Sequence, residues 1–174
     1  FRVESVLLKT HWVLVCMNQC SRHIIGFAVC KKTKTGESLC RMFNEVLQGL
    51  ALPKHLSRDH DPLFRTYRWE SHVRVLELDE VRGVPFIPTS RPFIERLIGT
   101  VRREFTDQIL FWNQYDLKRK LEQFKTFYNE ARVHYGLSGK TPDSLYKINS
   151  KHCSPKDLSW RSYCSGLYSV PMVV

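Results

Sequence analysis

Apolar residues gather in short runs near the start of the chain. The runs 11–17 (His-Trp-Val-Leu-Val-Cys-Met) and 24–30 (Ile-Ile-Gly-Phe-Ala-Val-Cys) are rich in β-forming residues, and the polar residues 18–23 separate them. This arrangement predicts two adjacent hairpin strands. Residues 1–8 alternate more weakly and predict the remains of an earlier strand.

The pattern then changes to a helical period. Residues 36–50 place apolar side chains three and four positions apart, which predicts an amphipathic helix. Three prolines punctuate residues 85–92, and the last of them fits the first turn of a helix. The other expected elements are a strand at 54–57, a short helix at 63–71, a strand at 74–79, helices at 93–105 and 116–131, and strand-like pieces at 163–170.

Hairpin strands followed by alternating helices and strands indicate an α/β fold with a mixed central sheet flanked by helices. The chain holds 27 Lys and Arg against 17 Asp and Glu, a formal charge of +10. Such an excess favours a polyanionic partner, with nucleic acid as the first candidate and a merely solvated basic surface as the alternative.

Composition also excludes some classes of protein. No apolar run approaches the ~18 residues of a membrane span, and no signal peptide opens the chain, so we expect a soluble intracellular protein without a membrane partner. Six cysteines lack a CxxC pair or paired histidines. Reduced structural thiols are therefore expected rather than a zinc site.

Two acids occupy positions from which a fold could aim them at one cleft. Asp59 follows the expected strand at 54–57, and Glu95 lies early on the helix after the proline-rich loop, with 35 residues between them. Carboxylates bind Mg²⁺ or Mn²⁺, and paired ions can activate a nucleophile at phosphorus. In a chain with 17 acids, solvated surface carboxylates remain the alternative.

Three segments resemble motifs of one family. Residues 91–104 (Arg-Pro-Phe-Ile-Glu-Arg-Leu-Ile-Gly-Thr-Val-Arg-Arg-Glu) resemble the third acidic motif of insertion-sequence transposases and retroviral-type integrases, and residues 57–64 resemble the second. Residues 128–142 resemble the Tyr-Asn-x-x-Arg-x-His and Thr-Pro signature that closes many insertion-sequence transposase cores. The motifs stand in the right order over most of residues 11–147.

The resemblance implies a DDE integrase or transposase catalytic core of RNase H-like fold over residues 1–150, followed by a C-terminal extension over 151–174. It implies a polynucleotidyl transferase that joins or cuts DNA with three acids and two Mg²⁺ or Mn²⁺ ions. Element ends and target DNA would be its partners, and a homo-oligomer would handle the two ends. Asp59 would be the second acid and Glu95 the third.

Two details qualify that assignment of acids. Asp61 is the alternative to Asp59, but it breaks the spacing and precedes Pro62, where it would cap a helix. The family's first acid lies on its first strand and would fall just ahead of Phe1, so we expect this strand to be truncated and catalysis to be impaired. Glu4 is the nearest substitute, but the strand period would point it to the opposite face.

A non-catalytic interpretation therefore stays open. In it, the chain is an inactive or domesticated integrase-like domain that still binds DNA. An RNase H-like nuclease acting on RNA–DNA hybrids has no support from the signature at 128–142. Asn18 stands where the family often has Asp, and a local turn role is favoured for it.

Arg102 and Arg103 follow Glu95 by seven and eight residues, two helical turns along on or beside the same face. Both are predicted to contact DNA phosphates, and Arg102 is the better candidate because related transposases have a basic residue at the seventh place. Pairing with a neighbouring acid is the alternative. For Arg132 and His134, pinning the last helix to the core is at least as favoured as contacting DNA. Packing is favoured over base stacking for the four tryptophans, Trp12, Trp69, Trp112 and Trp160.

Overall fold

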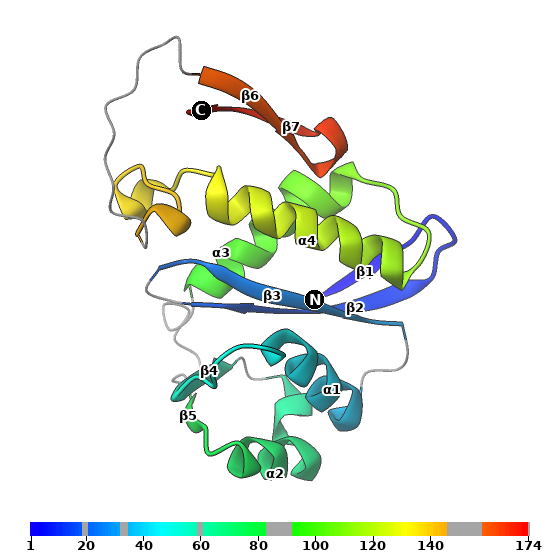
Figure 1. Ribbon diagram of the computed structural model, residues 1–174. Helices are drawn as coiled ribbons and strands as arrows, with labels where there is room; N and C mark the ends of the chain where they lie inside the picture. Colours follow the sequence, from blue (N-terminus) through cyan, green and yellow to red (C-terminus); the bar gives the residue numbers. More distant parts are fainter. Residues whose placement is uncertain (19–20, 32–34, 59–60, 83–91, 146–157, 174) are drawn as a thin grey trace.

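A sheet with helices on both faces forms the centre of the computed structural model (Figure 1), which describes residues 1–18, 21–31, 35–58, 61–82, 92–145 and 158–173. Its three strands are antiparallel in the order β1-β2-β3. They span Arg2–Glu4 (β1), Thr10–Met17 (β2) and Ile24–Cys30 (β3). The predicted hairpin and the shorter first strand are therefore confirmed.

Side chains alternate along these strands, so the two faces of the sheet pack into two different core clusters. Val13 and Phe27 join the main cluster, which they share with α4. Their neighbours Leu14 and Ala28, which pair across the hairpin, face the opposite side and pack with α1. Both faces of a period-two strand are covered here, which explains why the runs read as continuously apolar. In Figure 1, α3 and α4 cover one face of the sheet and α1 covers the other.

The first helix, α1 (Gly36–Leu47), begins at a capping box. The Thr35 hydroxyl accepts from the Ser38 backbone N–H at 3.1 Å, and the Ser38 hydroxyl accepts from the Thr35 N–H at 2.9 Å. Each bond satisfies a donor that the first turn would leave open. The helix ends three residues before the predicted boundary.

The segment after α1 corrects one prediction. The expected strand at 74–79 is wrong, because α2 (Tyr67–Val75) runs through its first two residues, with Trp69 and Val73 buried one turn apart. Glu77, with φ 52°, ends the helical path, and β5 (Asp79–Arg82) begins only then. It pairs in parallel with β4 (His55–Arg58), the strand expected at 54–57.

The predicted helix at 93–105 divides into two parts. α3 (Pro92–Thr100) is followed directly by a π-helical turn, Val101–Phe105. Leu97, Val101 and Phe105 are each buried in the main cluster, so the apolar stripe is continuous across the junction. Short 3-10 turns lie at Pro62–Arg65, Thr106–Gln108, Tyr135–Leu137, Asp143–Leu145 and Cys164–Gly166.

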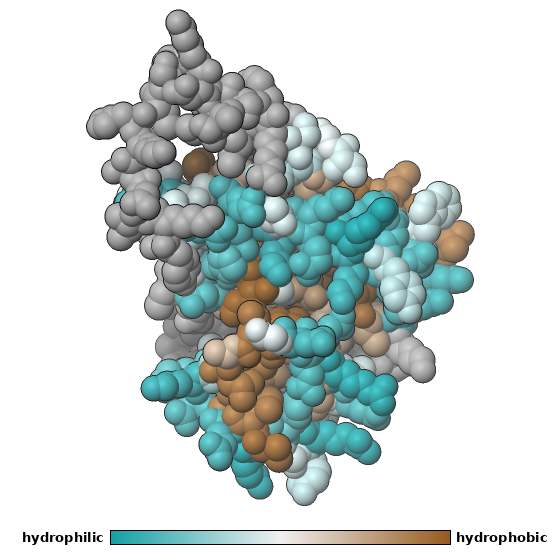
Figure 2. All heavy atoms as spheres, in the orientation of Figure 1, coloured by the Kyte–Doolittle hydropathy of each residue, from teal (hydrophilic) through white to brown (hydrophobic). Residues whose placement is uncertain are grey.

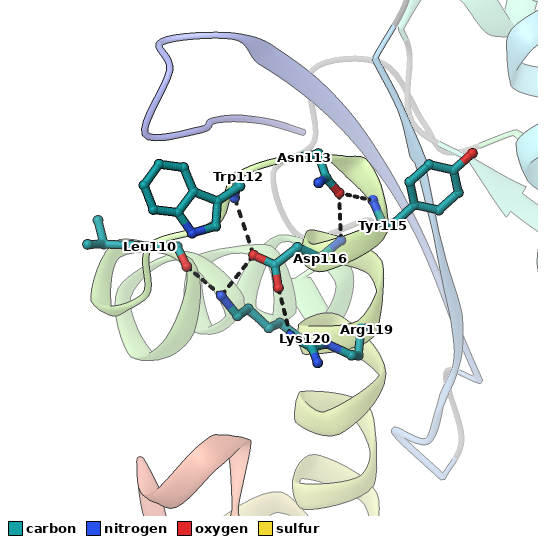
Figure 3. A network of polar contacts seen from close by, with 7 residues as sticks. All are labelled: Leu110, Trp112, Asn113, Tyr115, Asp116, Arg119 and Lys120. Carbon is teal, nitrogen blue, oxygen red and sulfur yellow. Dashed lines mark hydrogen bonds and ion pairs between the residues drawn. The ribbon is translucent and has the colours of Figure 1, made fainter.

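A polar network fixes the start of α4 (Gln114–Glu130), the helix predicted at 116–131 (Figure 3). The Asn113 side chain accepts from two first-turn backbone N–H groups at 3.0 Å each. The Asp116 carboxylate accepts from Lys120 and Arg119 at 3.0 Å and from the Trp112 N–H at 3.2 Å. Burial raises the Asp116 pKa, but these hydrogen bonds outweigh it and lower the pKa overall.

The chain ends in a hairpin of β6 (Leu158–Tyr163) and β7 (Tyr168–Val173), which packs on α4. The Tyr168 ring stacks on Phe127 with centroids 3.9 Å apart, and the Tyr168 hydroxyl donates to the Glu104 carbonyl. Tyr163 and Cys164 belong to the main core cluster. Figure 2 shows hydrophilic side chains over the outer face of α4 and an apolar patch below the sheet, between the positions of β4 and α1.

Two further expectations concern the described residues as a whole. None of the helices described is long and apolar enough to cross a membrane. The four cysteines within the described ranges form no disulfide, and burial raises the pKa of the Cys16 thiol to about 12. A raised pKa keeps a thiol protonated and poorly reactive, which is typical of a structural cysteine.

Candidate active site

Asp59 lies outside the described residues, but the strand that leads to it is held firmly. Arg58, the last residue of β4, is buried and forms an ion pair with Glu80 of β5, with Nη2 donating to Oε2 at 3.0 Å. The Trp69 indole N–H donates to the same carboxylate at 3.2 Å. Two strands and α2 therefore meet at this ion pair and fix the backbone immediately before Asp59.

The alternatives to the predicted acids have local roles. Asp61 accepts from the Leu63 backbone N–H at 3.0 Å and caps the turn after β4, as expected. Asn18 accepts from the Ser21 N–H at 3.1 Å, which is the turn role favoured for it. Glu4 is exposed, whereas its neighbour Val3 packs against the main cluster, so the two side chains lie on opposite faces of β1.

Glu95 lies in the first turn of α3 and is exposed. The preceding residue, Ile94, packs against the main cluster and anchors the turn. Within the described ranges, the Glu95 carboxylate has no hydrogen-bond or ion-pair partner. An anchored carboxylate with unoccupied oxygens is suited to a hard divalent cation. The described residues alone include no cluster of three metal-ligating side chains, and Asp59 is not among them.

A row of three residues runs along α3 from Glu95 through Gly99 to Arg103, each four positions after the last. A Cβ on Gly99 would lie 3.0 Å from the Arg103 Nη1, so the guanidinium lies back over the glycine, in the direction of Glu95. We call these three residues the α3 row. The π-helical turn holds more residues than an α turn and so rotates Arg103 closer to the line of Glu95.

Arg102 is also exposed but points elsewhere. Its guanidinium carbon lies 5.6 Å from the centre of the Phe1 ring, at the start of β1. Neither Arg102 nor Arg103 forms an ion pair with any residue that the structure describes, so the predicted alternative of pairing with a neighbouring acid is not observed there. Within the described part of the chain, Glu95, Arg102 and Arg103 thus lack ion-pair partners, and Arg103 is the arginine directed toward Glu95.

The residues of the Tyr-Asn-x-x-Arg-x-His signature have partners inside the fold. The buried Asn129 side chain accepts from the Ile24 N–H at 2.9 Å and donates to the Ile24 carbonyl at 3.0 Å, which joins α4 to β3. Arg132 donates to both Glu104 oxygens at 2.7 and 3.1 Å. These contacts pin the end of α4 to the core, which is one of the two roles that the sequence left open for Arg132.

His134 is buried against Tyr128, with ring centroids 4.7 Å apart. Burial, helped by the positive charge of Arg132, lowers the His134 pKa to about 4. The ring is therefore neutral at physiological pH. Among the tryptophans, Trp69 is fully buried as predicted, Trp112 is 59% exposed, and the side chain of Trp160 is outside the described part.

The ion pair between Arg58 and Glu80 was not predicted from the sequence. Arg58 lies within the second motif, directly before Asp59, and the sequence pattern assigns it no role. Its significance depends on the pairing of β4 with β5, in which Leu56 lies opposite Glu80 and Arg58 opposite Arg82. Only the strand register brings the two charges together, and the expected strand at 74–79 had the wrong position.

Sequence comparisons find an integrase family and a retroviral polyprotein. Residues 79–142 match the family described as the integrase core domain. The Gag-Pro-Pol polyprotein of Human T-cell leukemia virus 2 is 25% identical over 115 residues, which cover 64% of this chain and 8% of the polyprotein. The matched family segment begins at β5 and includes the whole α3 row and the signature.

Solved structures show the same fold. A chain of the simian T-cell lymphotropic virus intasome, solved in complex with the PP2A regulatory subunit B56 gamma, superposes with a TM-score of 0.68 at 16% identity. The match covers 92% of this chain and 59% of that one. The HTLV-2 integrase catalytic core, a dimeric form with magnesium, gives a TM-score of 0.62 at 17% identity over 84% and 91% of the two chains. The expected RNase H-like α/β fold is confirmed.

Proposed function

Because the chain has a DDE integrase-type core, we propose that it acts in DNA integration or transposition, by metal-dependent phosphoryl transfer on DNA. The observation that carries this proposal is the Glu95 carboxylate, which is exposed and without a described partner inside the segment that matches the integrase core family. Element ends and target DNA are the proposed substrates, inside the cell. The basic composition supports a DNA partner.

In this proposal, Asp59 and Glu95 hold Mg²⁺ or Mn²⁺. The HTLV-2 core was solved with magnesium, and carboxylate oxygens fit that ion. When bound, such ions activate a water or a 3′-hydroxyl and stabilise the leaving oxygen. The Arg58–Glu80 pair supports Asp59 by fixing the end of β4. Arg102 and Arg103 bind the phosphates of the DNA backbone. These phosphates pair with two cations that have no ion-pair partner in the described chain.

The resemblance assigns the family's first acid to a position ahead of Phe1, and this stays a prediction. Phe1 and Val3 both pack against the main cluster, so residues of the same parity before them would share this face with α3. Arg102 lies beside Phe1, which puts the π-helical turn after α3 next to the start of β1. We propose that a polypeptide of residues 1–174 binds Mg²⁺ weakly and shows little strand transfer.

Two organisational proposals accompany this function. Residues 1–150 form the catalytic core and 151–174 an extension, whose hairpin packs on α4. A homo-oligomer would bring two DNA ends together, and the related structures include an intasome and a dimeric core. The whole polyprotein and intasome chains are longer than this chain, so oligomer and substrate are inferred from the core alone.

The test adds an N-terminal strand carrying the expected Asp and measures Mn²⁺-dependent cleavage of labelled DNA duplexes. The extended chain should gain metal-dependent cleavage over residues 1–174. In that background, Asp59→Asn and Glu95→Gln should each reduce the rate on the order of 100-fold or more. Asp61→Asn is the matched control and should keep the rate, because Asp61 caps a turn.

The alternative predicts a different set of results. If the extended chain shows salt-sensitive duplex binding without any metal-dependent cleavage, the catalytic proposal is wrong. The domain would then be a DNA-binding relative without transferase activity. Binding is measured by fluorescence anisotropy on the same duplexes, so the two outcomes come from one set of samples.

A further inference from the structure

Arg22 occupies the turn between β2 and β3, far in sequence from the acids. It has a φ of 62°, which places its backbone in the left-handed region, and its side chain is half-buried. The guanidinium carbon lies 3.9 Å from the centre of the Phe93 ring. Phe93 is in the first turn of α3, two residues before Glu95. The turn therefore contacts the beginning of the helix that carries the predicted third acid.

A second contact confines the same guanidinium. A Cβ on Gly136 would lie 3.1 Å from both terminal nitrogens of Arg22, so the glycine leaves the space that the guanidinium occupies. Gly136 belongs to the 3-10 turn Tyr135–Leu137, directly after the signature residue His134. Arg22 thus joins three segments: the β2–β3 turn, the first turn of α3 and the turn after the signature.

The first turn of α3 has few other restraints among the described residues. Ile94 packs into the main cluster on one side, and Phe93 meets Arg22. Glu95 follows these two residues and points out. A planar guanidinium over an aromatic face restricts the ring's position in a way that a lysine ammonium at the same place does not.

We propose that Arg22 is a positioning residue for Glu95: it holds the Phe93 ring and thereby sets where the Glu95 carboxylate stands. This inference rests on the proposed function, in which Glu95 binds a divalent ion. Arg22 does not itself touch the metal or the DNA in this proposal. Its effect passes through Phe93 and one turn of helix.

The test uses the whole 174-residue chain and two NMR measurements. The first is hydrogen exchange at the amides of residues 96–98, which close the first turn of α3. The second is broadening of the Glu95 amide signal during a Mn²⁺ titration, a readout that detects weak metal occupancy. Arg22→Lys and Phe93→Leu should each speed the exchange about tenfold and raise the Mn²⁺ concentration needed for half broadening several-fold.

Conservative and control variants separate positioning from general stability. Phe93→Tyr keeps an aromatic face and should behave like the original chain. Gly136→Ala should displace the guanidinium, speed the exchange at residues 96–98 and raise the Mn²⁺ concentration needed for half broadening. Arg74→Lys, on the exposed surface of α2, is the matched control and should change neither. The double variant with Arg22→Lys and Phe93→Leu should change the exchange rate and the Mn²⁺ titration little more than either single variant does.

The two proposals fail in distinguishable ways. If Mn²⁺ leaves the Glu95 signal of the original chain unbroadened, the metal assignment is wrong, and the exchange rates alone then decide whether Arg22 holds the turn. If Mn²⁺ broadens that signal equally in the original chain, Arg22→Lys and Phe93→Leu, with unchanged exchange, the positioning role is wrong. A lower melting temperature without a change in either local readout would also overturn it.

Discussion

The signature segment, residues 128–142, and the α3 row use polar residues in opposite ways. In the signature segment, Asn129 and Arg132 each form paired hydrogen bonds within the chain, and His134 is buried against an aromatic ring. In the α3 row, Glu95 and Arg103 are exposed and have no ion-pair partner among the described residues. Both regions belong to the same family match, so sequence resemblance alone does not distinguish them.

The difference teaches which polar residues hold the fold and which are left for a ligand. A buried polar group without a partner is costly, so Asn129 and Arg132 are satisfied by bonds inside the fold. Within the described residues, the Nε2 of His134 is buried without a hydrogen-bond partner. An exposed charge incurs no such cost and can wait for a metal ion or a phosphate. Substitutions in the first region should therefore change stability, and substitutions in the second should change binding.

The largest effect on stability is expected for Asn129→Ala. The substitution removes both bonds to Ile24 and leaves a buried N–H and a buried carbonyl without a partner. The free energy of unfolding should fall by about 3 kcal/mol, measured by urea denaturation. Asn44→Ala, whose side chain bonds His72 on the surface, should cost less than about 1 kcal/mol. Equal losses for the two variants would mean that burial of Asn129 is not what matters.

The second effect is a dependence of stability on pH. Unfolded chains protonate histidine near pH 6.5, whereas folded His134 does so only at about pH 4. The unfolded state thus binds more protons between these values, so the His134 contribution is complete above pH 6.5 and is lost as the pH falls toward 4. The loss should reach about 2 to 3 kcal/mol.

His134→Asn should flatten this part of the curve of unfolding free energy against pH. Denaturant unfolding at intervals between pH 4 and 7 measures it. His55→Asn, at an exposed position on β4, is the control and should leave the slope of the original chain in place. A slope that survives in His134→Asn would assign the pH dependence to other groups.

The same contrast explains what the sequence could predict of the fold. β2 and β3 were placed within one residue, because a central hairpin covered on both faces produces two clear apolar runs. The strand expected at 74–79 failed because Val75, Leu76 and Leu78 also fit a helix end followed by a turn. The π-helical turn was not predictable, since its buried residues continue the helical spacing of α3.

For the site, the sequence predicted the exposed residues but not the contacts that hold the neighbouring backbone in place. The family motif marks Glu95, Arg102 and Arg103, and the structure exposes all three, on α3 and on the π-helical turn that follows it. Asp59 lies outside the described residues, so its meeting with Glu95 stays a prediction. The Arg58–Glu80 pair depends on strand register and the Arg22–Phe93 contact on a turn, and neither leaves a periodic signal in the sequence.

A smaller effect is expected within the α3 row, where one substitution should raise stability and weaken DNA binding. Gly99→Ala replaces a glycine inside a helix and should raise the free energy of unfolding by about 0.5 to 1 kcal/mol. The new Cβ would meet only the flexible end of Arg103, which moves aside. Thermal denaturation and duplex binding should therefore change in opposite directions, with higher stability and weaker binding. A loss of stability would show that Arg103 cannot leave its place over Gly99.

The smallest effect on stability and the sharpest on binding is expected for the arginines. Arg102→Gln and Arg103→Gln should each change the free energy of unfolding by less than about 0.5 kcal/mol, because neither has an ion-pair partner in the described chain. Each should reduce the slope of log binding constant against log salt concentration by about 1, as expected for one lost phosphate contact.

Arg132→Gln should do the reverse. It breaks the pair with Glu104, lowers the free energy of unfolding by about 0.5 to 1 kcal/mol, and leaves the salt slope unchanged. Fluorescence anisotropy on one mixed-sequence duplex at several salt concentrations measures all three. If Arg132→Gln lowers the slope as much as the other two, the signature segment also faces DNA, and a partner inside the fold does not exclude a residue from the interface.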